Sequence, residues 1–205
     1  MKLFFDTEFT GLHKDTTLIS IGIVSEDGRK FYAEFVDYDR SKVTPWIKEN
    51  VINQLKFQVP ISEEDYYYVA SRAKFNSRGN DLLSSWNLDM NGTKEIVMES
   101  LNQWLSQFDI IQFISDVCHY DFVLLIDLLT NGGTAIDLPE TISAVCHDIN
   151  QDIANHFNVP ERIAFDMSRE EVMRIVCPLN KIVTGDKHNS LYDAEVIKAI
   201  WEQIH

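Results

Sequence analysis

The chain begins with an apolar segment in the stretch Phe4 to Gly11, and the next two segments alternate apolar and other residues. Side chains two apart in an extended chain share a face, so this pattern predicts three strands with one buried face each. Asp27-Gly28 separates the second and third segments and is typical of a tight hairpin turn. We therefore expect three antiparallel strands at the start. The alternating apolar positions are Ile19, Ile21 and Ile23 in Leu18 to Val24, then Phe31, Ala33 and Phe35.

Helical spacing dominates most of the rest of the chain. Thr44-Pro45 is typical of a cap followed by proline at the first helical position. Short apolar runs at 110–114 and 142–146 predict further strands between the helices, so we expect an α/β fold with a mixed sheet covered on both faces. The other segments with helical spacing are 93–108, 119–129, 149–157, 168–176 and a last helix capped by Ser190.

Residues 56–92 interrupt this order with a polar stretch of 37 residues. It contains three consecutive tyrosines, Tyr66 to Tyr68, several basic residues, and breakers at Gly79-Asn80 and Asn91-Gly92. We expect one domain over 1–205 with an insertion at 56–92 that forms a short helix or hairpin. The insertion could stack bases and contact phosphates, form a dimer contact, or be an ordinary surface segment.

Composition narrows the class of protein. The chain is 45% hydrophobic and 24% charged, as in globular domains, and has no apolar run of about 18 residues that would span a membrane. Asp6 comes too early for a signal peptide, so we expect a cytoplasmic protein without a membrane partner. The three cysteines show no CxxC spacing, which predicts reduced thiols rather than a disulfide framework or a zinc site.

The net charge of −14 argues against binding of long nucleic acids through a broad basic surface. It does not exclude a nuclease that grips a chain end through divalent ions.

Two carboxylates stand in the first strand, where an apolar strand should be most buried. Asp6 and Glu8 are two residues apart and project to the same face, while Phe5 and Thr7 point away. Burial of two adjacent carboxylates calls for raised pKa values, a cationic partner or a metal ion. The alternative is a strand end in which both acids are solvated.

Two further acids face inward at helix starts. Leucines three, four, seven and eight residues after Asp121 put it on the buried side of its helix, and Ile197 and Ile200 do the same for Asp193. Each has a simpler explanation: Asp121 could interact with the helix dipole, and Asp193 could close a capping box with Ser190.

Four inward-facing acids at element ends suggest a shared site. Carboxylates bind hard divalent cations such as Mg²⁺ or Mn²⁺, and a pair of such ions supports phosphodiester cleavage. His188, five residues before Asp193, could serve as the base that activates water. A surface or hydrogen-bonding histidine is the alternative.

These residues resemble the motifs of the DEDDh 3′–5′ exonucleases. Asp6-x-Glu8, Tyr120-Asp121 and His188-x-x-x-x-Asp193 occur in the family's order across nearly the whole chain, and with Phe5 to Phe9 and Asp193-Ala194 they are most similar to the RNase AS type of exoribonuclease. The resemblance implies a ribonuclease H-like fold, in which a central mixed sheet begins with three antiparallel strands and has helices on both sides.

The resemblance also implies a mechanism. Asp6 would bridge two Mg²⁺ or Mn²⁺ ions, Glu8 and Asp193 would complete one site, and Asp121 would hold the second ion. His188 would deprotonate the attacking water, and nucleoside 5′-monophosphates would leave from the RNA 3′ end. By the same resemblance, Leu12 would wedge against the terminal base, the backbone near Phe9 would read the 3′ hydroxyl, and the protein would form a homodimer.

The chain departs from the family pattern at two points. Phe9 stands where many members have threonine, and Val117-Cys118-His119 stand where an asparagine often precedes the second-motif aspartate. Asp116, at the end of the fourth strand, is a rival to Asp121 for that role. We favour Asp121 because an aromatic residue precedes it and leucine periodicity follows it.

Other functions remain open from the sequence. The same site could act on single-stranded DNA or short oligonucleotides, and the fold could serve as a non-catalytic module that binds RNA or protein through the insertion. A serine or cysteine hydrolase is disfavoured because the chain has no G-x-S-x-G elbow and no cysteine in an activating motif.

Overall fold

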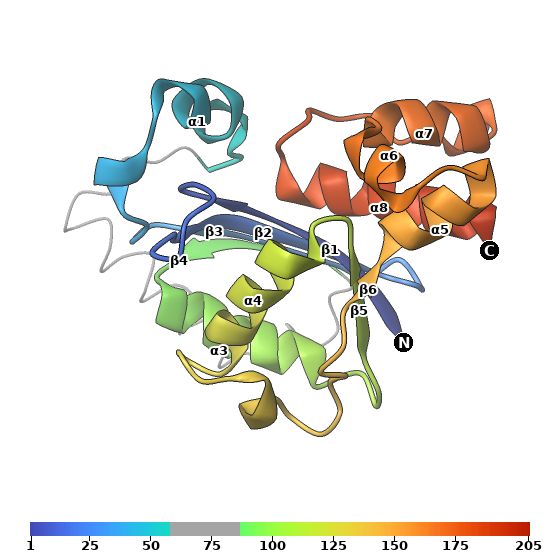
Figure 1. Ribbon diagram of the computed structural model, residues 1–205. Helices are drawn as coiled ribbons and strands as arrows, with labels where there is room; N and C mark the ends of the chain where they lie inside the picture. The colour runs from blue at the N-terminus through green and yellow to red at the C-terminus, as the bar shows by residue number, and fades with distance from the viewer. Residues whose placement is uncertain (58–86) are drawn as a thin grey trace.

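A six-stranded mixed sheet forms the centre of the protein, whose computed structural model describes residues 1–57 and 87–205 (Figure 1). The strand order is β4-β3-β2-β1-β5-β6. The first three strands are antiparallel neighbours, whereas β4 runs parallel to β3, β5 to β1 and β6 to β5. The strands are β1 (Lys2–Phe9), β2 (Leu18–Ser25), β3 (Lys30–Phe35), β4 (Asn87–Gly92), β5 (Gln112–Ser115) and β6 (His147–Asp148).

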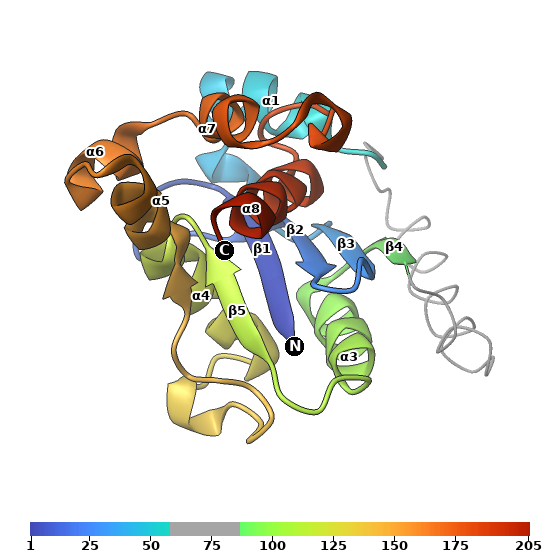
Figure 2. The ribbon, with the colours of Figure 1, turned by 90° about the vertical axis from the view of Figure 1, so that its right-hand side faces the viewer.

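Helices cover both faces of this sheet. Figure 1 shows α3 and α4 below the sheet and α5 to α8 above it, and Figure 2 shows α8 lying along β1 and β2. No helix of the described residues is both long and apolar enough to cross a membrane. The helices are α1 (Pro45–Asn50), α3 (Lys94–Leu105), α4 (Cys118–Leu129), α5 (Ile149–Phe157), α6 (Glu161–Asp166), α7 (Arg169–Val176) and α8 (Ser190–Ile204).

The predicted fold class is confirmed: the protein has the α/β, ribonuclease H-like arrangement with three antiparallel strands first and helices on both sides. The alternation in β1 divides the core into two layers. Leu3 and Phe5 pack with the apolar side chains of α3 and α4, while Phe4 packs with those of α5, α7 and α8. By the same parity, Asp6 and Glu8 face α8 and Thr7 faces α4.

The C-terminal end of the expected insertion is a strand rather than a break. Asn87–Gly92 forms β4 at the edge of the sheet, parallel to β3, so the prediction that Asn91-Gly92 breaks regular structure was wrong. Leu88 and Met90 alternate and pack against the core, but the intervening Asn and Asp residues have low strand propensity and hid this pattern. Residues 58–86, with the three tyrosines and the basic residues, lie outside the described part of the chain.

Three local predictions need correction. The strand expected at 142–146 is reduced to one bridge between Ile142 and Ile111, and pairing resumes only at β6. The short helix α6 was missed because its six residues are too few to show a clear period. Helix α8 is capped by Asn189, whose side chain accepts from the Tyr192 N–H, and not by Ser190. Ser190 is instead buried and hydrogen-bonded to Ser20 of β2 at 3.0 Å.

Candidate functional site

A cavity of about 750 Å³ lies at the carboxyl end of β1, between α1, α6 and the start of α8. This is the edge at which open α/β sheets commonly bind ligands. Apolar and aromatic side chains form much of its lining. The lining includes every acid and the histidine expected at the site, together with Asp116, the rival candidate: Asp6, Glu8, Asp121, His188, Asp193 and Asp116.

The parallel pairing of β1 and β5 brings the carboxylates of Asp6 and Asp116 together. Phe4 pairs with Ile114, so two residues further along each strand Asp6 and Asp116 come side by side with the same facing. Asp116 follows directly after the last residue of β5. The sheet register therefore places two acids at one edge although they are 110 positions apart.

Asp121 is buried in the first turn of α4 and is held by two hydroxyl groups. Thr7 Oγ1 donates to its Oδ1 at 2.7 Å, and Ser115 Oγ donates to its Oδ2 at 2.6 Å. Thr7 reaches Asp121 because it faces α4, opposite to its neighbours Asp6 and Glu8. The two bonds fix the carboxylate next to the end of β1.

Asp193 and His188 are positioned by the start of α8. The His188 backbone N–H donates to Asp193 Oδ2 at 2.9 Å. Asp193 was expected to bond back to the backbone of the cap residue. It instead accepts from His188, the residue before the cap Asn189. His188 has a φ of 64°, which is uncommon for a residue other than glycine. Its Nδ1 lies 3.8 Å from Glu8 Oε1. Its ring packs edge-on against that of Trp46, with ring centroids 5.1 Å apart.

The carboxylates and the imidazole fall into two groups that could each hold a metal ion. Potential ligand atoms of Glu8, His188 and Asp193 lie within 4.8 Å of one another, as do those of Asp6, Asp116 and Asp121. Asp6 Oδ2 is buried and has no hydrogen-bond partner among the described residues. Buried acceptors are normally satisfied, so this orphan oxygen and the oxygen-rich donor set fit a hard divalent cation.

The electrostatics of the site point the same way. Burial raises the pKa of Asp6 well above its usual range, and the charges of Asp121 and Asp193 raise it further. Burial also raises the pKa of Asp121 and of Asp193 to about 8. The pKa of Glu8 is raised by burial too, an effect that His188 opposes. Charges from both ligand groups therefore raise the pKa of Asp6. Such a site favours either protonated carboxyl groups or bound cations.

The two residues expected to contact substrate both line the cavity. Phe9 stacks on Tyr120 with ring centroids 5.7 Å apart and an interplanar angle of 18°. It follows a register shift in β1 between Glu8 and Phe9. Leu12 is 70% exposed, so its side chain is available to a ligand.

Sequence reasoning missed several residues of this cavity. Trp46 and Phe165 line it with 55% and 47% of their surface exposed, and Arg169 forms an ion pair with Asp116 at 2.9 Å. The sequence did indicate Asp116, as the rival to Asp121 at the end of the fourth strand. No sequence signal pointed to Arg169, 53 residues further along.

Of the three cysteines, Cys146 does not offer a competing nucleophile. The three are free, and the Sγ atoms of Cys118 and Cys146 are 2.9 Å apart. The hydrogen bond with Cys118 and burial raise the pKa of the Cys146 thiol. A raised pKa disfavours the thiolate that nucleophilic chemistry requires.

Comparison with known proteins gives a partial similarity. No family model matches the chain. A segment of 55 residues is 40% identical to a protein named 3′-5′ exoribonuclease in each of two strains of Mycobacterium tuberculosis, and covers 27% of this chain and 33% of that protein. The matched segment therefore spans about a third of the length of these relatives. A solved structure described as "3′-end specific recognition of histone mRNA stem-loop by 3′-exonuclease" is 11% identical, covering 98% of this chain and 61% of that one, with a TM-score of 0.49.

Proposed function

We propose that this protein is a 3′–5′ exoribonuclease that removes nucleoside 5′-monophosphates from the 3′ end of RNA with the help of two divalent metal ions. The observation that carries the proposal is the meeting of two ligand groups, one around Asp6 and one around Glu8, in a single cavity. The similarity of 55 residues to proteins named 3′-5′ exoribonuclease supports the same reaction.

The ligand types suit Mg²⁺ or Mn²⁺. Asp6, Glu8 and Asp193 would hold one of the two ions, and Asp6 and Asp121 would hold the other. Bound divalent ions would supply charge stabilisation for the attacking and leaving oxygens of the phosphodiester. The hydroxyls of Thr7 and Ser115 hold the Asp121 carboxylate in one orientation.

His188 would act as the general base. Its neutral imidazole can accept a proton from the attacking water near neutral pH. Its backbone bond to Asp193 and its ring contact with Trp46 restrict where the ring can move. Glu8, 3.8 Å from Nδ1, would stabilise the imidazolium that results.

The cavity wall supplies the contacts for the 3′-terminal nucleotide. Leu12 is exposed and would pack against the terminal base, while the backbone at Phe9 would bind the 3′ hydroxyl. The net charge of −14 suits an enzyme that holds a chain end rather than a long duplex. Bound cations would offset the repulsion between the acidic site and the phosphates.

A time course with end-labelled oligomers tests this proposal. RNA and DNA of the same sequence, labelled at the 5′ or the 3′ end, would be incubated with Mg²⁺, with Mn²⁺, or with EDTA. We expect stepwise shortening of 5′-labelled RNA and early release of labelled mononucleotide from 3′-labelled RNA, in both cases only with metal.

Two other outcomes would replace the proposal. Preferential shortening of DNA would make the protein a deoxyribonuclease with the same site. Binding of RNA without any metal-dependent cleavage would favour a non-catalytic module. Asp121→Asn should abolish cleavage, and Asp127→Asn is the matched control because Asp127 lies on the same helix but pairs with Lys94 at 2.6 Å.

A further inference from the structure

Asp116 lies close to two of the proposed metal ligands although no motif assigns it to the site. Its carboxylate belongs to the group in which potential ligand atoms of Asp6, Asp116 and Asp121 lie within 4.8 Å of one another. The sequence left Asp116 and Asp121 as rivals for a single role. The structure brings both to the same place, so the two need not be alternatives.

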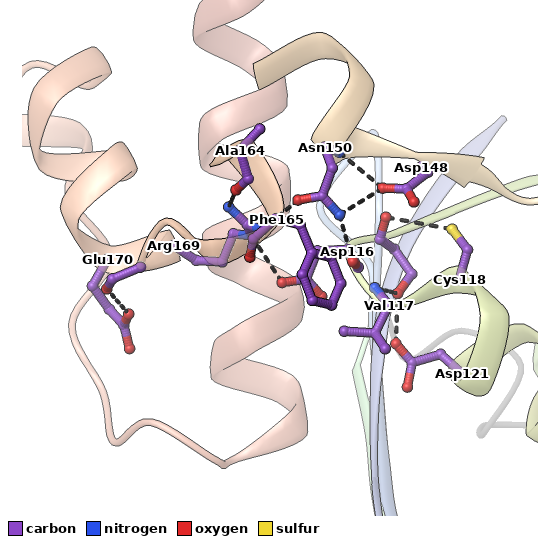
Figure 3. A network of polar contacts seen from close by, with 12 residues as sticks. Asp116, Val117, Cys118, Asp121, Asp148, Asn150, Ala164, Phe165, Arg169 and Glu170 are labelled. Carbon is purple, nitrogen blue, oxygen red and sulfur yellow. Dashed lines mark hydrogen bonds and ion pairs between the residues drawn. The ribbon is translucent and has the colours of Figure 1, made fainter. Parts of the chain in front are cut away.

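Asp116 is held in place by residues that do not belong to this group. Arg169 Nε donates to Asp116 Oδ2 at 2.9 Å, and Asn150 Nδ2 donates to the Asp116 carbonyl oxygen at 2.6 Å (Figure 3). The ion pair is largely shielded, with side-chain exposures of 13% for Arg169 and 16% for Asp116. Among the described residues, no donor contacts Asp116 Oδ1, which leaves that oxygen available.

Arg169 is held in place by several other acceptors. Its guanidinium donates to the carbonyl oxygens of Ala164 and Phe165 and to Asn150 Oδ1. These contacts join the end of α6 and the start of α7 to the residues after β5. A guanidinium with this many partners serves as an anchor for Asp116 rather than as a mobile group that follows a substrate phosphate.

A second observation distinguishes this group from an ordinary acidic cluster. Asp6 Oδ2 is buried and lacks a hydrogen-bond partner among the described residues. If Asp116 were only the counterion of Arg169, its approach to two more carboxylates would be unfavourable without compensation. A cation between the three carboxylates would satisfy the orphan oxygen and remove the repulsion.

We propose that Asp116 is an additional carboxylate ligand of the metal ion held by Asp6 and Asp121, and that Arg169 is the residue that positions it. The inference rests on the proposed metal-dependent function for the kind of ion. It adds a fifth carboxylate to Asp6, Glu8, Asp121 and Asp193, and makes the α6–α7 segment a support of the metal site.

Calorimetric titration of the metal-free protein with Mn²⁺ tests the ligand role of Asp116 without reference to activity. We expect two Mn²⁺ ions to bind the wild type. In Asp116→Asn, the affinity for one of these ions should fall at least about tenfold. The amide oxygen of the variant can still accept from Arg169, so its melting temperature in EDTA should not fall.

Asp148→Asn is the matched control for disturbance of the surrounding network. Asp148 accepts from the side chain and backbone of Asn150 and caps α5, a role that asparagine also fills, and it lies outside both ligand groups. It should change Mn²⁺ affinity less than about twofold. Unchanged Mn²⁺ binding by Asp116→Asn, or an equal loss in Asp148→Asn, would overturn the ligand role.

Arg169→Gln separates positioning from simple electrostatics. Loss of a positive charge should by itself tighten binding of a cation. If Arg169 positions Asp116, the variant should instead bind Mn²⁺ about tenfold more weakly while it keeps every ligand. Tighter binding in this variant would overturn the positioning role.

These measurements also separate the inference from the proposed function. Weaker Mn²⁺ binding by Asp116→Asn in a protein that cleaves no RNA would support the ligand role and refute the nuclease. RNA cleavage by the wild type with unaltered Mn²⁺ binding in Asp116→Asn would do the reverse. Absence of Mn²⁺ binding by the wild type would refute both.

Discussion

Gly22 of β2 lies directly against the backbone of Leu191 at the start of α8. A Cβ atom at Gly22 would be 2.3 Å from the Leu191 nitrogen and 2.4 Å from its Cα, closer than any real contact. Glycine is needed here for a close approach of helix and strand and not for a special φ angle. This contact sets the distance from β1 and β2 to the helix that carries Asp193.

Gly22→Ala should therefore impair both stability and the site. The backbone of α8 must move away from the sheet, which we expect to lower the free energy of unfolding by about 3 kcal/mol and to weaken Mn²⁺ binding through Asp193. Urea unfolding and metal titration would measure the two effects.

Gly28→Ala is the matched control for that substitution. A Cβ at Gly28 would meet nothing within 4 Å, and its φ of +93° implies only a local cost of about 1 kcal/mol. Metal binding should stay at the wild-type value. Equal loss of metal affinity in both variants would show that the packing of α8 against Gly22 does not control the site.

Asp121→Asn should remove metal-dependent cleavage while the protein stays folded. Asp121 is 1% exposed, and asparagine has almost the same shape, so Thr7 and Ser115 lose little packing. We expect the cleavage rate to fall more than about 100-fold because a charged ligand is lost. Turnover near the wild-type rate, with the circular dichroism spectrum unchanged, would show that Asp121 is not the essential ligand and would assign that role to Asp116.

His188→Asn should reduce the rate without loss of metal ions. Asparagine tolerates the left-handed backbone that His188 adopts at φ 64°, so this variant tests the imidazole and not the loop. We expect a rate lower by about 10²–10⁴-fold. A rate near the wild-type value would exclude His188 as the base.

The metal-free protein should lose stability as the pH rises. Burial raises the pKa of Asp193 to about 8 from an ordinary value of 3.8, so the folded state binds a proton that the unfolded state releases. This contribution is complete below about pH 3.8 and is lost as the pH passes through about 8. Asp121 should behave in the same way, since its pKa is also raised to about 8.

Thermal unfolding in EDTA between pH 5 and pH 8.5 would measure this effect. Asp193→Asn imitates the protonated group, so at high pH it should be more stable than the wild type by about 1–2 kcal/mol, or roughly 2–8 °C in Tm. The difference should shrink as the pH is lowered from 8.5 to 5, and Mg²⁺ should stabilise the wild type more than the variant. A wild type whose Tm rises steadily to pH 8.5 in EDTA, relative to the variant, contradicts the prediction.

The sequence alone determined much of the fold and the choice of candidate residues. Alternation in β1 and β2 and helical spacing around Asp121 and Asp193 involve residues only a few positions apart, so they can be read directly from the chain. The same local periods predicted that Asp6, Glu8, Asp121 and Asp193 face inward. Strand β4 escaped because its polar residues weaken the alternation.

Only the tertiary structure decided how these residues are grouped. The β1–β5 register sets Asp6 beside Asp116, and the packing of α6 and α7 brings Arg169 to Asp116 across 53 residues. Such contacts depend on strand register and helix docking, which no local period encodes. The sequence thus specified which acids turn inward, whereas long-range packing specified which of them lie close enough to hold a cation together and that Asp116 lies among them.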